Sequence, residues 1–269
     1  MRLDMGLQTK QLSFDDIFNT PPIEAKQPII EQKAPKTKKQ KEITEDGLIK
    51  KFEEISRLSR FPIHTVFEDF CKIGAISFHN AYQNLPAMKY YKEQYDTLEA
   101  EYLRLTKKYG QEQTHLLAEG LSMLAILMYS SPRDYLGRVF HRLNLNKHYH
   151  GQFFTPDHIC QLMAEMTLSP NFDEELKRKG YFSIAEPTCG SGAMLIGAYK
   201  VLQDRNIANI GDILYIEATD LDPLCVDMAF LQLSILGLKA RVMHGNTFSQ
   251  EIFHTYHTPE LQLVNPECR

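Results

Sequence analysis

The chain has 269 residues, of which 43% are hydrophobic, 24% charged and 10% aromatic. This length suits one large domain or a domain with a smaller partner, and this composition excludes collagen-like, coiled-coil and wholly disordered chains. Because the formal net charge is −4, any affinity for nucleic acid must come from a local cluster of cations that neutralises phosphate groups.

The five cysteines and the first residues of the chain indicate in which cellular compartment we expect the protein. The cysteines are widely spaced without a Cys-x-x-Cys pair, so the sequence predicts neither a disulfide framework nor a zinc site, and we expect no metal. The first residues lack the apolar core of a signal peptide, and the most hydrophobic later stretch, Leu116 to Tyr129, is too short to span a bilayer. We therefore expect a cytoplasmic protein with no membrane insertion.

Residues 1–44 are predicted to form a flexible basic arm. The segment holds four prolines and then five lysines within nine positions, namely Lys33, Lys36, Lys38, Lys39 and Lys41. Such a composition cannot bury enough apolar surface to offset the entropy of the chain. A solvated linker is the favoured interpretation over non-specific contact with phosphate groups, because runs of charge are usually solvated.

Residues 45–147 are predicted to form an all-helical domain. Thr44-Glu45-Asp46 is typical of a helix N-terminus, and apolar residues then recur at helical spacing, as Leu48, Phe52, Ile55 and Leu58. Further stripes follow over residues 67–78 and 95–105, and residues 115–129 are typical of a buried helix. Pro132 is expected at the start of the last helix, where its missing N–H does no harm. We assign these stripes to the core.

Residues 148–269 alternate between β-rich and helical runs. We expect strands at Tyr181 to Ala185, Ile213 to Thr219, Ala240 to His244 and Leu261 to Val264. We expect helices at Asp157 to Met166, Ala193 to Leu202 and Pro223 to Leu238, and a connector over residues 248–256. Thr155 is the expected cap of the first of these helices. The alternation indicates βαβ units, so the predicted fold class is α/β, a Rossmann-like sheet of about four parallel strands after an all-helical N-terminal domain.

A turn of small residues follows the first predicted strand, in Glu186-Pro187-Thr188-Cys189-Gly190-Ser191-Gly192. Gly190 and Gly192 let the backbone turn tightly and let a ligand approach it without an intervening Cβ atom. The N–H groups at the start of the next helix can face a polar or anionic group. A dinucleotide fingerprint would have another glycine at position 195, where this chain has Leu195, so nicotinamide dinucleotide binding is disfavoured.

Acidic and polar residues end the next two predicted strands. The second strand ends in Thr219-Asp220-Leu221-Asp222-Pro223, which places a carboxylate where an acceptor can take both hydroxyls of a ribose. Asp220 is the favoured ligand, because Asp222 before a proline suits a helix cap. After the third strand, Asn246 and Phe248 have the chemistry to edge and cover an adenine ring, and a plain turn explains them nearly as well.

Three ordered motifs resemble a known family. They are Gly151-Gln152-Phe153-Phe154-Thr155-Pro156, the glycine turn at 186–192 and the acidic segment at 219–223. In this order and spacing they resemble the S-adenosylmethionine-dependent adenine-N6 DNA methyltransferases, especially the modification subunit of type I restriction-modification systems. Asp134-Tyr135-Leu136-Gly137 is similar to the family's Asp-x-Leu-Gly segment. The resemblance covers residues 130–265 well, whereas residues 45–130 share only a helical character with the family. It implies a class I methyltransferase sheet.

The resemblance also implies S-adenosylmethionine as cofactor and a set of residues that contact it. The methionine end would be flanked by Phe154, Thr155 and Pro156. The methionine and sugar side would be lined by Glu186, Gly190 and Gly192, with Pro187 in the same turn. The ribose hydroxyls would bind Asp220, and the adenine would meet Asn246 and Phe248. Simpler interpretations stay open, with Phe154 in the core, Thr155 a helix cap and Glu186 a surface acid.

The family's catalytic motif is matched in part after the fourth predicted strand. In the family an amide or acidic residue precedes Pro-Pro and an aromatic, and the amide oxygen and the first proline carbonyl accept hydrogen bonds from the adenine amino group. Asn265 and Pro266 match this pattern and are the predicted catalytic residues. Glu267 and Cys268 replace the second proline and the aromatic, so the stacking that stabilises an extruded base would be lost. Transfer by the isolated chain is therefore in doubt.

The sequence thus predicts an adenine-N6 DNA methyltransferase of restriction-modification type, with DNA and the specificity or restriction subunits as partners. One alternative is a cofactor-binding or regulatory subunit of such a complex. Another is a methyltransferase acting on a small molecule or protein, for which no sequence feature speaks. If residues 261–264 form an apolar edge strand, we expect a homodimer through that strand or cover from the N-terminal helices.

Overall fold

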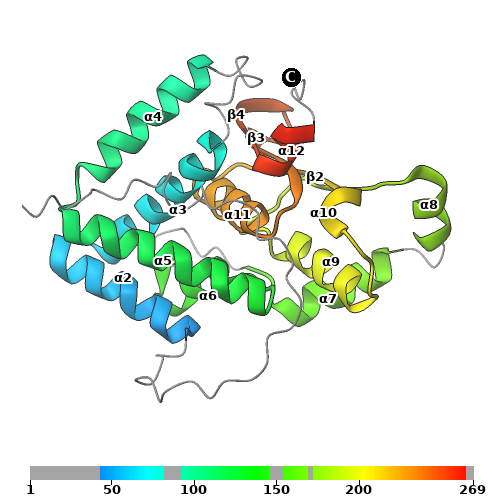
Figure 1. The fold of residues 1–269 in the computed structure, drawn as a ribbon, viewed down its shortest axis with the longest axis horizontal. Helices are drawn as coiled ribbons and strands as arrows, with labels where there is room; N and C mark the ends of the chain where they lie inside the picture. The colour runs from blue at the N-terminus through cyan, green and yellow to red at the C-terminus, as the bar shows by residue number, and fades with distance from the viewer. Residues whose placement is uncertain (1–42, 82–91, 146–153, 169–171, 265–269) are drawn as a thin grey trace, which may run out of the picture. The chain divides into compact units, whose positions relative to one another are not determined.

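The computed structural model describes residues 43–81, 92–145, 154–168 and 172–264, without the side chains of residues 92, 93, 173 and 175. The chain from residue 42 onward forms one compact unit (Figure 1). The predicted arm at 1–44 lies almost wholly outside the described residues, as do Asn265 and Pro266 and the predicted domain boundary near residue 147. Within the described ranges, no helix combines the length and hydrophobicity that crossing a bilayer requires.

The first part is helical, as predicted, and its described residues form five helices. They are α2 (Glu45–Ser59), α3 (Ile63–Asn80), α4 (Lys92–Thr106), α5 (Gln111–Ser130) and α6 (Tyr135–Arg142). Thr44 caps α2 by accepting a hydrogen bond from the backbone N–H of Gly47 at 3.1 Å. The expected helix start at Pro132 is wrong. Helix α6 begins after Asp134, whose carboxylate accepts the N–H of Gly137. Pro132 has no side-chain acceptor and could not cap a helix in this way.

Ten elements follow in the second part. They are α7 (Asp157–Thr167), α8 (Phe172–Lys179), β1 (Phe182–Glu186), α9 (Ala193–Asp204), α10 (Ile210–Ile213), β2 (Leu214–Asp220), α11 (Pro223–Ile235), β3 (Lys239–Asn246), β4 (Glu251–His257) and α12 (Pro259–Val264). The first three predicted strands and the three predicted helices are confirmed. Thr155 is not a cap, because Pro156 occupies the cap position of α7 and its carbonyl accepts the first helical hydrogen bonds.

The sheet has the order β1-β2-β3-β4, with β1, β2 and β3 parallel and β4 antiparallel to β3. Two predictions are therefore wrong: residues 251–257 form a strand where a connector was expected, and residues 261–264 are helical. Gln250 adopts a positive φ of 58°, which reverses the chain into a hairpin. At the other end, the Gln262 N–H bonds to the Thr258 carbonyl and begins a helical turn. The premise of a dimer through an edge strand at 261–264 is lost.

Helix α11 joins the two parts through a shared core. It packs against α3, α5 and α6 and also against β2 and β3 (Figure 1). Its Met228 and Leu231 belong to the hydrophobic cluster of the helical part, whereas Phe230 and Leu233 belong to the cluster of the sheet. A helix that is apolar on all sides is typically buried, and α11 fits that pattern.

The sheet buries one face and leaves parts of the other face open. Along β2, Leu214, Ile216 and Ala218 are buried while Glu217 is exposed and pairs with Arg241 of β3. Because β1, β2 and β3 are parallel, their carboxyl ends lie at the same edge of the sheet. Glu186, Asp220 and Asn246 are the last residues of these three strands. This edge is where the predicted site residues gather.

Candidate functional site

Backbone and hydroxyl hydrogen bonds tie the three strand ends together. The N–H of Cys189, after β1, donates to the Thr219 carbonyl of β2 at 2.8 Å. The hydroxyl of Thr247, after β3, donates to the Pro187 carbonyl at 2.5 Å. The segment 187–192 is therefore hydrogen-bonded to the end of β2 and to the residue that follows β3.

The glycine turn depends on the absence of side chains at two positions. Gly190 has φ +53° and Gly192 has φ +90°, which favour glycine over other residues. A Cβ atom on Gly190 would lie 3.2 Å from the ring of Phe154, and one on Gly192 would lie 3.3 Å from the Cα of Ala229. Gly192 occupies the cap position of α9 and no side chain caps that helix, so its first amides have no side-chain acceptor among the described residues.

Asp220 and Asp222 divide two tasks at the end of β2. Asp220 accepts the backbone N–H of Gly190 at 2.8 Å on one oxygen and that of Asp222 at 2.9 Å on the other. Each carboxylate oxygen retains capacity for a further donor. Asp222 caps α11 by accepting the Leu224 N–H at 2.9 Å, with Pro223 in the first turn, as predicted.

The strand edge is acidic. Glu186 accepts the N–H and the hydroxyl of Thr188 at 3.2 and 3.5 Å, and among the described residues no lysine or arginine pairs with Glu186 or Asp220. Such a surface favours a positively charged ligand group. Burial, followed by the nearby carboxylates of Asp220 and Glu186, raises the pKa of the Cys189 thiol. A raised pKa disfavours the thiolate, which is the nucleophilic form of a cysteine.

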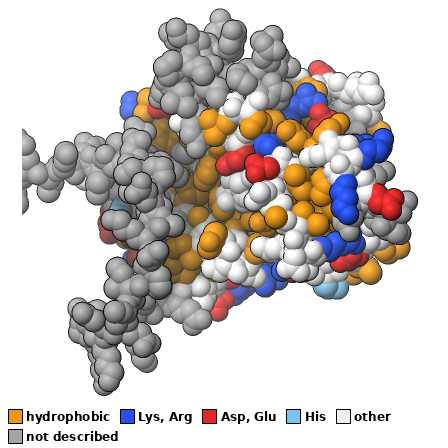
Figure 2. Space-filling view, turned by 45° about the vertical axis from the view of Figure 1, so that its right-hand side comes forward, with side chains coloured by type: hydrophobic (Ala, Val, Ile, Leu, Met, Phe, Trp, Pro, Cys, Tyr) orange, Lys and Arg blue, Asp and Glu red, His pale blue; other side chains and the backbone are white. Residues whose placement is uncertain are grey.

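Basic side chains elsewhere on the surface are mixed with acidic and hydrophobic ones. Figure 2 shows one face of the molecule on which lysine and arginine side chains lie scattered between the other two kinds. Several basic residues are also paired with acids, such as Lys200 with Asp204 at 2.6 Å and Arg205 with Glu165 at 2.6 Å. Such pairing leaves these cations less free to neutralise phosphate groups.

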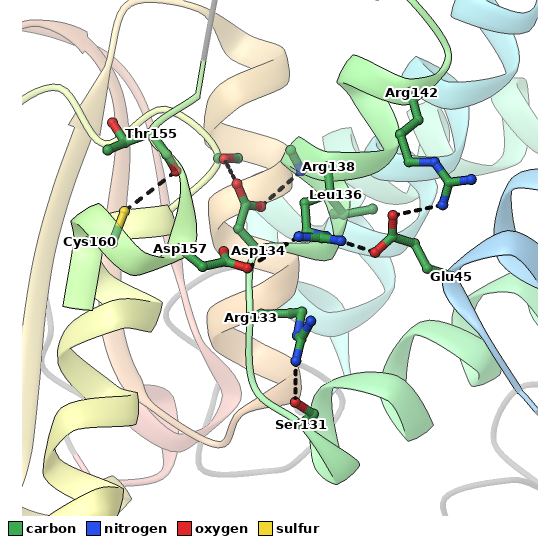
Figure 3. Close-up of polar contacts among 12 residues, drawn as sticks. Glu45, Ser131, Arg133, Asp134, Leu136, Arg138, Arg142, Thr155, Asp157 and Cys160 are labelled. Atoms are coloured by element: carbon green, nitrogen blue, oxygen red, sulfur yellow. Dashed lines mark hydrogen bonds and ion pairs between the residues drawn. The ribbon is translucent and has the colours of Figure 1, made fainter. Parts of the chain in front are cut away.

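Phe154 reaches the glycine turn from a distant part of the sequence. Its ring lies against Gly190, and its centroid is 5.2 Å from that of Phe140 and 5.4 Å from that of His141. Its backbone N–H donates to Nε2 of His141 at 2.9 Å. Thr155 and Pro156 are exposed, and the Thr155 carbonyl accepts a weak hydrogen bond from Sγ of Cys160 at 3.5 Å (Figure 3).

Asn246 and Phe248 do not join the packed part of the site. The side-chain oxygen of Asn246 accepts the backbone N–H groups of Phe248 and Ser249 at 3.0 and 3.2 Å, which closes a turn. Phe248 is 97% exposed. The geometry is that of the plain turn, and a contact of either residue with adenine stays a prediction.

Sequence reasoning missed a buried polar cluster directly behind the glycine turn. Asp134, Ser191 and Gln232 are each at most 4% exposed. The Asp134 carboxylate accepts from the Ser191 hydroxyl at 2.5 Å and from Nε2 of Gln232 at 2.9 Å. Burial raises the pKa of Asp134, although these hydrogen bonds oppose the rise. A polar Gln232 within the apolar run of α11 was the signal that could have indicated the cluster.

A second hollow lies away from the strand edge. Its volume is about 390 Å³ and its lining comes from α3, α4 and β4, namely Lys72, Gln94, Thr97, Leu98, Glu101 and His254. Lys72 donates there to the hydroxyl of Tyr256 at 2.9 Å. None of the predicted site residues lines this hollow. The described residues contain no cluster of three or more His, Cys, Asp or Glu suited to a metal ion.

Comparison with known proteins gives one match that covers the whole site. Residues 133–267, which are 135 of the 269 residues, match the model of a family described as N-6 DNA methylase. Among solved structures, a candidate class I S-adenosylmethionine-dependent methyltransferase from Listeria monocytogenes is 17% identical, with a TM-score of 0.40. The match covers 74% of this chain and 52% of that chain, so this chain spans about half the length of that protein. No curated protein matches the chain.

Proposed function

Because the chain belongs to the N-6 DNA methylase family, we propose that it binds S-adenosylmethionine at the carboxyl ends of β1, β2 and β3 and methylates adenine N6 in DNA. The observation that carries this proposal is the meeting of three distant segments at Gly190. Its N–H bonds to Asp220, and its Cα faces the ring of Phe154. Family membership implies the same cofactor.

The charge and shape of the site suit this cofactor. S-adenosylmethionine carries a positive sulfonium and a positive amino group, which the carboxylates of Glu186 and Asp220 would attract. The remaining acceptor capacity of Asp220 would serve the ribose hydroxyls. The two glycines allow close approach to the backbone, and Phe154 would close the methionine end.

The proposed chemistry is direct transfer to the base. The bound cofactor supplies an electrophilic methyl group, and the site residues orient it. Asn265 and the Pro266 carbonyl are the proposed acceptors for the adenine amino group, which aligns the nitrogen for attack. Extruding the base costs a few kcal/mol, and Glu267 and Cys268 offer no aromatic surface to offset that cost. We therefore include specificity or restriction subunits as proposed partners, in a cytoplasmic restriction-modification complex.

A second candidate is a subunit that binds the cofactor without transferring the methyl group. The path of the chain after β4 favours it. Because β4 runs antiparallel, His257 pairs with Arg241 near the start of β3, about 17 Å along the strand from Asn246. Gln262 donates to the His257 carbonyl at 2.6 Å, so the described chain up to Gln262 stays near the start of β3, at the end of the strands opposite the glycine turn.

Two measurements on the full chain separate these candidates. Calorimetry with S-adenosylmethionine measures binding, and transfer of a labelled methyl group to long DNA measures activity, with poly(dG)·poly(dC) as the adenine-free control. Asn265→Ala should abolish transfer and leave the Kd for the cofactor unchanged. Binding without transfer in the unaltered chain would support the second candidate. No binding at all would overturn both.

A further inference from the structure

One face of α6, with its capping residue, contacts the glycine turn, the start of α7 and Phe154. Asp134 caps the helix, and Arg138 and His141 follow at positions i+4 and i+7, which lie on the same face of a helix. Asp134 contacts Ser191 in the glycine turn. Arg138 pairs with Asp157 at the start of α7 at 3.5 Å (Figure 3). His141 accepts the backbone N–H of Phe154.

We propose that α6 is a positioning helix that sets the spacing between Phe154 and the glycine turn, with Asp134 as its main positioning residue. This inference rests on the proposed function, because it assigns to α6 the control of cofactor affinity. Asp134 itself does not touch the cofactor surface, since it is 4% exposed and lies behind Ser191.

The surroundings of Asp134 exceed what a helix cap needs. A capping side chain has to satisfy one or two N–H groups and usually stays in contact with solvent. Here one oxygen accepts the Gly137 N–H at 2.8 Å and the Gln232 amide at 2.9 Å, and the other accepts the Ser191 hydroxyl. No lysine or arginine of the described residues pairs with Asp134. A buried carboxylate without a cation is costly unless hydrogen bonds compensate, so Asp134 depends on these three donors, and they fix its position.

Ser191 transmits this arrangement to the turn. It is fully buried between Gly190 and Gly192, so a fixed Ser191 fixes the two flexible residues on either side. The Ser191 carbonyl also accepts from Nε2 of Gln232 at 2.9 Å, while the Gln232 oxygen accepts the Leu136 N–H at 3.1 Å. The amide of Gln232 therefore joins α6, α11 and the turn in one network.

Space around the network is tight. A Cβ atom on Gly137 would lie 2.7 Å from Oγ of Ser191 and closer still to the Asp134 carboxylate, so this position of α6 has no room for a side chain. A Cβ atom on Gly190 would lie 3.2 Å from the ring of Phe154, whose N–H is held by the same helix. A shift of α6 would consequently move the Phe154 ring relative to Gly190.

The test compares variants of the network with a matched buried acid. Asp134→Ala and Ser191→Ala remove the link, whereas Asp134→Asn keeps an acceptor for Gly137 and supplies a donor for Ser191. Asp69→Asn is the control for a buried acid far from the turn, because Asp69 is 6% exposed and accepts from Tyr109 at 2.7 Å and from Lys108 at 2.9 Å within the helical part. Each full-length variant is measured for thermal unfolding, for the Kd of S-adenosylmethionine and for hydrogen exchange at amides 189–192.

We expect Asp134→Ala and Ser191→Ala to raise the Kd about tenfold and to speed exchange in the turn, as expected for loss of a charged hydrogen bond. Asp134→Asn should restore most of both properties. Asp69→Asn should lower the unfolding temperature and leave Kd and exchange unchanged. Unaltered Kd and exchange in folded Asp134→Ala and Ser191→Ala would overturn the positioning role. An unaltered chain that does not bind the cofactor would overturn the proposed function, and the exchange data would still decide on the turn.

Discussion

The backbone N–H of Gly190 donates to the Asp220 carboxylate at 2.8 Å, which joins the turn after β1 to the tip of β2 across thirty residues of sequence. The hydrogen bond restrains the backbone of Gly190 through the carboxylate of Asp220. It also leaves both carboxylate oxygens with capacity for another donor. A ligand that binds Asp220, as proposed, would therefore share this side chain with the turn.

Asp220→Ala is expected to weaken cofactor binding more than any change at an exposed acid. The variant loses the acceptor for ribose hydroxyls and also frees the Gly190 N–H. Hydrogen bonds to charged groups contribute about 1.5 to 3 kcal/mol, which corresponds to a rise in Kd of about tenfold or more. Asp204→Ala, with a half-exposed side chain on α9, is the control. Equal Kd values for the two variants, measured by calorimetry, would rule out the ribose assignment.

Alanine variants of three glycines with positive φ distinguish the cost of backbone strain from the cost of a steric clash with the new Cβ atom. Gly192 has φ +90° and faces Ala229, whereas Gly180 has φ +75° and no atom within 4 Å of the place that a Cβ atom would take. Both alanine variants should lose about 1 kcal/mol from strain. Gly192→Ala should lose more, because the Cα of Ala229 in the buried helix α11 cannot move aside. Gly190→Ala should also raise the cofactor Kd by pushing the ring of Phe154.

Denaturant unfolding of the three variants checks this order. If Gly180→Ala lowers the free energy of unfolding as much as Gly192→Ala does, the contact between position 192 and Ala229 of α11 does not affect stability. Backbone strain alone would then explain both losses.

Asp227 in α11 makes the folded state more stable at low pH than at neutral pH. Its carboxyl is 5% exposed, and burial raises its pKa to about 6 although Lys72, at 3.4 Å, opposes the rise. Because this pKa lies above the ordinary 3.8, the folded protein holds the proton more tightly than the unfolded chain. The contribution is fully present below about pH 4 and is lost as the pH rises through about 6, and it amounts to about 3 kcal/mol.

Asp227→Asn removes this dependence. Relative to the unaltered protein, the variant should gain stability between pH 5 and pH 8, as measured by urea unfolding. Asp204→Asn should show no such trend. A stability difference between Asp227→Asn and the unaltered protein that is the same at both pH values would contradict the expectation.

Three histidines have the opposite effect to Asp227, because they make the folded state less stable at acidic pH. Burial lowers the pKa of His79 to about 3 and those of His254 and His257 to about 4. Since the folded-state values lie below the ordinary 6.5, the stabilisation is present above pH 6.5 and is lost as the pH falls toward 4. For His79 the loss between pH 6.5 and 5 is about 2 kcal/mol.

His79→Gln should flatten the fall in stability over this range, whereas His115→Gln, at an exposed position, should not. Urea midpoints at pH 6.5, 5.5 and 5 measure both. An unchanged slope in His79→Gln would show that other groups cause the acid sensitivity.

Local patterns predicted the parts of the fold that local physics determines. The strands β1, β2 and β3 are short apolar runs separated by helices, and the capping acid Asp222 precedes a proline. Strand β4 was not predicted, because its sequence, Glu251-Ile252-Phe253-His254-Thr255-Tyr256-His257, mixes polar with apolar residues. The apolar run at 261–264 is too short for periodicity to separate helix from strand.

The site was predictable where its residues are close in sequence. The glycine turn and Asp220 follow from spacing, because both sit directly after predicted strands. The pairing of Asp134 with Ser191 spans 57 positions, and nothing in either local sequence indicates the partner. Likewise, no local pattern predicts that Nε2 of His141 accepts the backbone N–H of Phe154. Such contacts are decided by tertiary packing.

The position of α11 in both hydrophobic clusters has a consequence for how the protein denatures. Removing the helical part would strip Met228 and Leu231 of their neighbours, while removing the sheet would do the same to Phe230 and Leu233. Neither half can melt while the other stays native, so calorimetry should record a single cooperative transition from residue 42 onward. Loosening anywhere along this one helix would disturb both the sheet on one side of it and the helices on the other.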